Sequence, residues 1–293
     1  MIDSLYIAAS GMHAQQLNVD VIANNLANVS TGGFKKKRVS FEDLLYRDVA
    51  KSNGLVGSSD AVHRLGVGTA ISGAGKIFTQ GDLKKTDAPL DVAVRGQGFF
   101  EVVLPDGSYG YTRSGSFQIN NDGFLTTADG NVLKASVQIP TDTKEIVVQP
   151  DGHVLAGVPN EKNMVALGQI ELANFVNPSG LNPLGDNLYQ PTENSGQVTY
   201  GKPADTGFGS LSQGFIESSN VKLVEEMINL IVAQRAYEIN SKVVQASDEL
   251  LTMSNNSVFC MSFGFLLLLV LFDGAKVQCL FRLHFQTVVY HYT

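Results

Sequence analysis

The residues that most resemble catalytic or ligand-binding motifs are three glycine pairs, a few histidines and several Asp-Gly pairs. Each Gly-x-Gly loop lacks the third glycine and the strand-to-helix setting of a dinucleotide-binding loop. These loops cover residues 66–68, 73–75 and 96–98. His13, His63 and His153 lack the spacing of metal ligands, and Asp before Gly is typical of turns rather than of paired catalytic acids. We therefore predict no catalytic residue, no bound metal or cofactor, and no small-molecule substrate.

Asparagines near the N-terminus offer a different chemistry, that of recognition. The stretch NVDVIANNLANVSTGGFKK (18–36) carries a single charge, Asp20, before Lys35. A water-facing helix normally carries Lys and Glu on its polar side, whereas an amide donates and accepts hydrogen bonds and can pair with protein without burying a charge. Two interpretations stay equally open: a polar face that meets other copies of the chain, and a soluble helix that is poor in charge. The proposed inter-subunit polar face comprises Asn18, Asn24, Asn25 and Asn28.

These asparagines need a helix to position them, and the spacing of apolar residues predicts one over residues 3–29. Its apolar positions are separated by three or four residues, which is the pattern of a heptad seam. The N-terminal seam consists of Leu5, Ala8, Met12, Val19, Ile22, Leu26 and Val29, with Gln15 as a polar member. Gly32 and Gly33 then end the helix.

A second apolar seam predicts a C-terminal helix over residues 218–256. Its core positions are Val224, Ile228, Val232, Ile239, Val243 and Leu250. Charged residues beside this seam indicate one side facing water. Isolated helices are marginal in water, so both helices need partners. We expect them to pair with each other as a coiled coil.

The chain between the helices is predicted to be β-structure, which makes the fold class α+β. Short runs rich in β-branched and aromatic residues alternate with turns that contain Asp-Gly. The predicted strands are 91–94, 99–104, 110–112, 116–119, 145–149, 153–157 and 165–175. No helical pattern separates them, which argues against a parallel sheet. The expected divisions are an N-terminal helix (1–30), an extended linker or hairpin (31–75), a β-rich domain (76–217), a C-terminal helix (218–256) and an atypical hydrophobic tail (257–293).

Composition narrows the possible partners. The net charge of −7 argues against nucleic acid, which needs a basic surface. The longest basic run, Lys35 to Arg38, is interpreted as a solvated turn. Arg95 and Arg113 fit either interface ion pairs or solvated strand ends. The N-terminus has no positive segment followed by a long apolar core, so we expect no cleaved secretory signal.

Several segments together resemble the axial (rod and hook) proteins of the bacterial flagellum. They are NVDVIANNLANVSTGGFKKKR (18–38), FEDLLY (41–46), DVAVRGQGFFEVVLPDG (91–107), YTRSGSF (111–117) and SNVKLVEEMINLIVAQRAYEINSKVVQASDELL (219–251). The resemblance covers residues 1 to 256 in order. Within the family, the 41–46 block and the long 48–75 segment favour the distal rod over the hook or the proximal rod.

This resemblance implies a structural subunit that polymerises into a helical tube, transmits torque and encloses the export channel. It also implies that the two end helices form a coiled-coil inner domain and that the β-rich middle (76–217) forms an outer domain. It implies export by the flagellar type III system and a location in the basal body, as a rod that spans the periplasm. The implied partners are other copies of the chain, the proximal rod and hook proteins, and the ring bushing of the peptidoglycan layer and outer membrane. Residues 48–75 would match a segment that stiffens the rod.

The tail departs from that family. Residues 258–272 are a nearly continuous apolar run, and both cysteines, Cys260 and Cys279, lie beyond residue 256. The run is slightly short for a membrane span. We favour a read-through or frame error, with a natural extension or a membrane anchor as alternatives. The other functions considered are a hook or proximal rod subunit and, from another class, a membrane-tethered β-domain adhesin.

Overall fold

The computed structural model describes residues 2–44, 46–49, 63–135, 137–158 and 164–271, and these ranges form an α+β protein. The chain divides into two compact units. The smaller unit comprises Met1–Met12, Leu45–Gly68 and Glu238–Thr293. The larger unit comprises His13–Leu44 and Thr69–Tyr237. Both long helices cross this division, which was not among the predicted boundaries.

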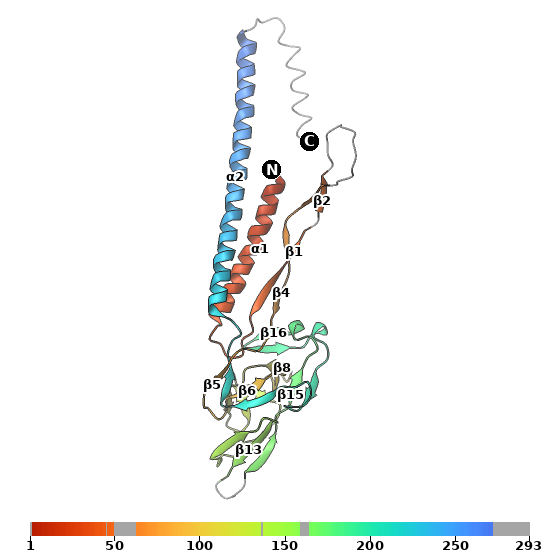
Figure 1. Cartoon of the computed structure of the whole chain (residues 1–293), viewed down its shortest axis with the longest axis vertical. Helices are drawn as coiled ribbons and strands as arrows, with labels where there is room; N and C mark the ends of the chain where they lie inside the picture. Colours follow the sequence, from red (N-terminus) through yellow and green to blue (C-terminus); the bar gives the residue numbers. More distant parts are fainter. Residues whose placement is uncertain (1, 45, 50–62, 136, 159–163, 272–293) are drawn as a thin grey trace. The chain divides into compact units, whose positions relative to one another are not determined.

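Two α-helices occupy the positions predicted by the apolar spacing (Figure 1). Helix α1 spans Ile2–Ala27, and the chain turns at Gly33, whose φ of 71° suits glycine. Helix α2 spans Leu223–Leu271. It therefore continues past the predicted end at residue 256, through a segment that no proline interrupts. Residues 272–293 of the tail lie outside the described part of the chain.

The larger unit contains an antiparallel sheet of seven described strands. Its order is β16 (Asn182–Gly185), β17 (Leu188–Gln190), β8 (Tyr109–Thr112), β7 (Phe100–Val103), β11 (Val132–Leu133), β10 (Leu125–Thr127) and β9 (Phe117–Ile119). A three-stranded sheet follows the order β12 (Glu145–Val148), β13 (His153–Gly157) and β14 (Val165–Gln169). The described strand pairs are all antiparallel, in agreement with the sequence prediction.

Further strands form two-stranded ribbons. In the larger unit the pairs are β1 (Lys37–Asp43) with β4 (Thr69–Lys76), β15 (Leu172–Asn174) with β18 (Thr199–Gly201), β6 (Val92–Arg95) with β19 (Ser210–Gln213), and β5 (Leu83–Lys85) with β20 (Phe215–Glu217). In the smaller unit β2 (Tyr46–Val49) pairs with β3 (His63–Gly66). Short 3₁₀ turns lie at Pro178–Gly180 and Glu193–Ser195. The central residues of the 48–75 segment, 50–62, lie outside the described ranges.

Four turn glycines have the backbone geometry that the Asp-Gly pairs predict. Gly107, Gly123, Gly130 and Gly152 have φ angles between 83° and 89°. In each turn the glycine N–H donates to the carbonyl of the residue three positions earlier. A residue with a Cβ would be strained at such a φ, so these glycines set the ends of the neighbouring strands.

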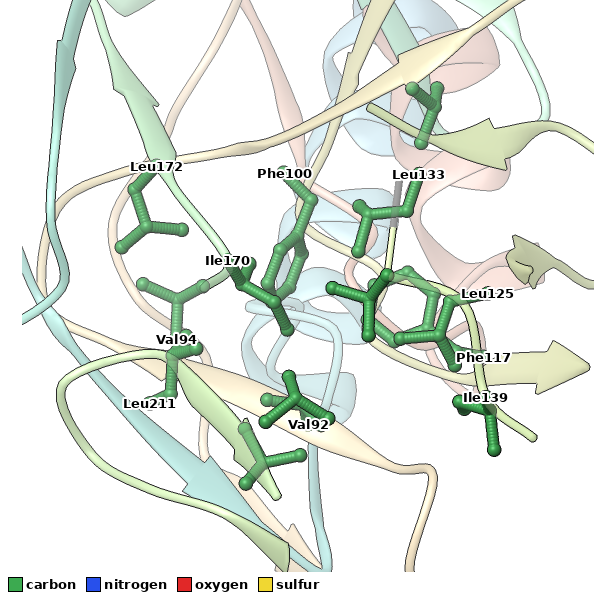
Figure 2. Packing of buried hydrophobic residues seen from close by; sticks show 14 of the residues in the cluster. Val92, Val94, Phe100, Phe117, Leu125, Leu133, Ile139, Ile170, Leu172 and Leu211 are labelled. Atoms are coloured by element: carbon green, nitrogen blue, oxygen red, sulfur yellow. The ribbon is translucent and has the colours of Figure 1, made fainter. Parts of the chain in front are cut away.

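The two faces of strand β7 belong to different cores. Phe100 and Val102 pack into a large apolar cluster with residues such as Val94, Leu133 and Ile170 (Figure 2). Phe99, which immediately precedes β7, belongs to a second cluster together with Tyr111, Phe175 and Tyr189. Neighbouring side chains on a strand point to opposite faces, so both faces of this part of the sheet are buried within the chain itself.

Candidate functional site

A buried carboxylate, Glu217, ties together segments that lie far apart in the sequence of the larger unit. Its Oε1 accepts a bond from Lys35 Nζ at 2.6 Å and its Oε2 accepts one from Arg113 Nε at 3.0 Å. Lys35 follows α1, Arg113 follows β8, and Glu217 ends β20 shortly before α2. The side chains of Lys35 and Glu217 are at most 1 % exposed. Lys35, Arg113 and Glu217 are called the junction triad below.

The junction triad contains two cations and one anion, and backbone oxygens complete its hydrogen bonding. Lys35 Nζ also donates to the Thr79 carbonyl at 2.7 Å, and Arg113 donates to the carbonyls of Gly96 and Gly98. Burial lowers the pKa of Lys35 and that of Arg113, and the charge of Glu217 opposes both shifts. Removal of one member of the triad would therefore leave buried charged groups without their partner and destabilise the fold.

Two sequence interpretations are corrected here. Lys35 does not lie in a solvated turn, because its whole side chain is buried against Glu217. Arg113 is neither an interface residue nor a solvated strand end, because it is 4 % exposed and pairs within the chain. The shared partner Glu217 lies 182 residues from Lys35 and 104 residues from Arg113. No local sequence pattern indicates a carboxylate so far away, which explains both errors.

Close packing at the junction also explains why residue 33 is a glycine. A Cβ built on Gly33 would lie 2.8 Å from the Ser114 nitrogen, and the residue has a positive φ. Its N–H donates to the Glu217 carbonyl at 2.7 Å. The glycine predicted to end the helix therefore also allows the chain to approach the junction triad.

Asn25 forms a second buried network near the start of α2. Its Nδ2 donates to the Lys37 carbonyl at 2.9 Å and to Glu226 Oε2 at 3.3 Å, and its Oδ1 accepts from the Lys37 N–H at 2.9 Å. Lys36 Nζ lies 3.3 Å from Glu226 Oε1. Both Nδ2 and Oδ1 of Asn25 are thus bonded inside the chain. No sequence pattern distinguishes this asparagine from Asn24 or Asn28.

The other predicted asparagines of α1 have different surroundings. Asn24 is exposed, whereas Asn18 and Asn28 are partly exposed. Asn18 donates to Gln15, and Asn28 Nδ2 donates to the Asn24 carbonyl of the same helix. In the N-terminal seam, Ala8 and Ile22 are buried. The half-buried members are Leu5, Met12, Val19, Leu26 and Val29.

The predicted seam of α2 is exposed along its length. The exposed fractions range from 41 % at Val243 to 68 % at Val224. The exposed members are Val224, Ile228, Val232, Ile239, Val243 and Leu250. We call these residues the outer seam.

A different line of α2 residues faces α1 in each unit. Glu226, Ala233, Asn240 and Ser247 recur every seven residues. In the larger unit, Asn25 bonds Glu226 and Ala233 is buried. In the smaller unit, a Cβ on Gly11 would lie 2.9 Å from Asn240 Nδ2, and the hydroxyls of Ser4 and Ser247 are 3.5 Å apart.

These two lines of α2 have opposite chemistry. The line that faces α1 consists of three polar residues and one alanine, whereas the outer seam consists of Val, Ile and Leu. At 3.6 residues per turn the centres of the two lines are about 120° apart around the helix. The contacts in the smaller unit run antiparallel, since the step from Ser4 to Gly11 corresponds to the step from Ser247 back to Asn240. Burial of α2 within the chain therefore leaves its most apolar side uncovered.

The described residues contain no cluster of His, Cys, Asp and Glu suited to a metal ion. Within the same ranges, no helix is both long enough and apolar enough to cross a membrane.

Three family models match the chain. Residues 5–35 match "Flagella basal body rod protein", residues 93–156 match "Flagellar hook protein FlgE/F/G D1 domain", and residues 212–257 match "Flagellar basal body rod FlgEFG protein C-terminal". The first match contains the α1 asparagines and Lys35, and the third contains Glu217 and the outer seam.

Several curated proteins are similar in sequence to this chain over most of their length. The flagellar basal-body rod protein FlgG of Buchnera aphidicola subsp. Acyrthosiphon pisum is 46 % identical over 254 residues, which are 86 % of this chain and 98 % of that protein. FlgG of Borreliella burgdorferi is 44 % identical, covering 87 % and 98 %. FlgG of Agrobacterium fabrum is 42 % identical, covering 87 % and 99 %.

Proposed function

The chain belongs to the FlgG family of flagellar basal-body rod proteins, and we propose that its outer seam carries contacts between copies in the distal rod. It is a structural subunit of that rod and not an enzyme. Its neighbours are further copies of itself together with other rod and hook proteins. The exposed apolar side of α2 is the single observation that supports the outer seam as an assembly surface.

The exposed area gives this proposal its energetic basis. Complete burial of a Val, Leu or Ile side chain is worth about 1.5–3 kcal/mol, so a half-exposed residue of the outer seam has about 1 kcal/mol still to gain. Monomeric soluble proteins rarely expose a long contiguous apolar surface. Contact with a second copy would cover the outer seam without disturbing the polar line that faces α1.

The asparagines of α1 form the second surface that we propose for contacts between copies. We place Asn18, Asn24 and Asn28 at contacts between copies. The side-chain hydrogen bonds of Asn18 and Asn28 stay within the neighbouring turn of the chain, and Asn24 is exposed. Asn25 already has partners in the chain, so we assign its main role to the fold. Pairing of α1 and α2 as a coiled coil belongs to the same proposal.

Further features of the proposal follow from family membership. Contacts between unlike surfaces of identical copies generate open helical polymers when the rotation does not close. Such a polymer would form a tube that transmits torque and encloses the export channel. We further propose export by the flagellar type III system without a cleaved signal, a periplasm-spanning location, and contact with the ring bushing of the peptidoglycan layer and outer membrane.

The test is a charge placed in the outer seam. Ile239→Asp should raise the protein concentration needed for polymer formation at least about tenfold, because assembly would bury an unpaired carboxylate. Gln245→Asp, on an exposed polar part of the same helix, is the matched control and should change that concentration less than about twofold. Sedimentation and electron microscopy of the full chain provide the measurement. Normal polymer from Ile239→Asp would overturn the assignment of the outer seam.

Ile22→Asp is a less specific variant, because Ile22 is 5 % exposed within the chain. A loss of assembly in that variant would combine misfolding with a lost contact. Its far-ultraviolet circular dichroism therefore has to be compared with that of Ile239→Asp, which should keep the native spectrum.

A further inference from the structure

Two lysines face each other across the β1–β4 ribbon without a carboxylate between them. Lys37 and Lys76 are directly opposite in the antiparallel register, an arrangement of like charges that destabilises a strand pair. In the described part of the chain, no acidic side chain forms an ion pair with either lysine. The Lys76 ammonium instead donates to Tyr189 Oη at 3.1 Å and lies 4.5 Å from the centre of that ring.

These lysines line a cavity of about 380 Å³ within the larger unit. The end of α1 contributes Asn24 and Asn28 to the wall, and the β16–β17 turn contributes Asp186 and Asn187. Asn187 fixes that turn by donating to the Gly32 carbonyl at 3.0 Å. Two ammonium groups, three side-chain amides and the Asp186 carboxylate thus line a space large enough for a side chain.

We propose that this cavity receives an Asp or Glu side chain from a neighbouring copy of the chain. The inference rests on the proposed assembly function and adds a specific polar contact to it. A carboxylate accepts hydrogen bonds from ammonium and amide groups together, and it would remove the repulsion between the two lysines. The chain has 28 acidic residues against 21 Lys and Arg, so each copy carries surplus carboxylates.

The charged surroundings of Lys76 favour an external partner. Burial, with a smaller contribution from the Lys37 charge, lowers the pKa of Lys76 to about 8. Asp186 lines the same cavity, but among the described residues its carboxylate forms no hydrogen bond or ion pair with either lysine. The end of α1 contributes neutral amides. An incoming carboxylate would therefore meet an ammonium that contacts aromatic rings and the Tyr189 hydroxyl but forms no ion pair with a carboxylate of the described residues.

Carbodiimide cross-linking tests the proposal, since it joins a lysine to a carboxylate in direct contact. Polymer assembled from equal amounts of ¹⁴N and ¹⁵N full-length protein would be cross-linked, digested and mapped by mass spectrometry. The expected product joins Lys76 or Lys37 to an acidic residue of a differently labelled copy. Cross-links of these lysines to Asp186 of the same copy alone, or unmodified lysines in the polymer, would overturn the inference.

Variants give an independent readout. Lys76→Met should raise the concentration needed for polymer formation about tenfold, whereas Lys76→Arg should keep it within about threefold. Lys84→Met, which removes an exposed lysine of the larger unit, should have no effect. Equal behaviour of Lys76→Met and Lys84→Met would overturn the inference while leaving the outer seam intact. Failure of the unmodified protein to polymerise would overturn the proposed function and this contact together.

Discussion

At the scale of single residues, the junction triad has more positive than negative charge, and this imbalance predicts unequal effects of its three members. Glu217→Gln would leave Lys35 and Arg113 buried together without a counter-charge. Loss of one partner from a buried ion pair costs about 3–5 kcal/mol, and we expect Glu217→Gln to lower the free energy of unfolding by that amount. Lys35→Met would leave a balanced pair of Glu217 and Arg113 and should cost roughly 1–2 kcal/mol.

Urea unfolding of the unassembled protein, followed by far-ultraviolet circular dichroism, measures both costs. The chain has no tryptophan, so backbone dichroism is a better probe than fluorescence. Equal costs for Glu217→Gln and Lys35→Met would contradict the charge imbalance described for the triad.

Residue roles were the least predictable feature of the sequence. Asn24 and Asn25 are adjacent and chemically identical, yet one is exposed and the other bonds Lys37 and Glu226. The difference depends on where β1 and α2 lie in the folded chain, which no local pattern contains. Lys35 and Arg113 were misinterpreted for the same reason, since their shared partner Glu217 is distant in sequence.

At the scale of elements, the Asn25 network controls how α2 begins. Asn25→Ala would remove the hydrogen bonds of the Asn25 amide to the Lys37 backbone and to Glu226 Oε2, at a cost of about 1–3 kcal/mol. We expect faster hydrogen exchange over the first turns of α2, measured by mass spectrometry on the unassembled protein. Asn24→Ala is the matched control, since Asn24 is exposed, and it should change stability by less than about 0.5 kcal/mol.

The same two variants separate folding from assembly. Asn24→Ala should impair polymer formation while the monomer stays native, because Asn24 belongs to the proposed polar face. A monomer destabilised by Asn24→Ala, or one unaffected by Asn25→Ala, would contradict the roles given to the two residues.

Helices and turns were easier to predict than the roles of single residues, because short stretches of sequence determine where helices and turns form. The Asp-Gly pairs located turns at Gly107, Gly123, Gly130 and Gly152, where a positive φ is required. Apolar periodicity located both helices, but it could not say which side of α2 faces α1. That side proved to be the polar line of Glu226 and Asn240, because a sequence pattern does not distinguish contacts within a chain from contacts between chains.

At the scale of the whole molecule, Lys76 links assembly to pH. Its pKa of about 8 in the unassembled protein means that the ammonium is mostly charged at pH 7 and mostly neutral at pH 9. A carboxylate partner needs the charged form, so polymer formation should weaken as pH rises through 8. Between pH 7 and 9 we expect the required protein concentration to rise about tenfold.

Folding should respond to the same titration with the opposite sign. Between about pH 8 and 10.5 the unfolded chain holds more protons at Lys76 than the folded chain does, so this group makes the fold more stable as pH rises. Tyr189, beside Lys76, has its pKa raised by burial and does not titrate in this range. Lys76→Arg should assemble with a much flatter pH dependence, and an unchanged slope in that variant would contradict the assignment.

The charge count around Glu217 also restricts the order in which related sequences can diverge. A lineage that first replaces Lys35 retains a neutral pair of Glu217 and Arg113. Its fold therefore tolerates further substitutions at these positions. A lineage that first neutralises Glu217 passes through a form with two confined cations and no anion. Substitution histories at these three positions are therefore expected to be directional, with the acidic member the last to be exchanged.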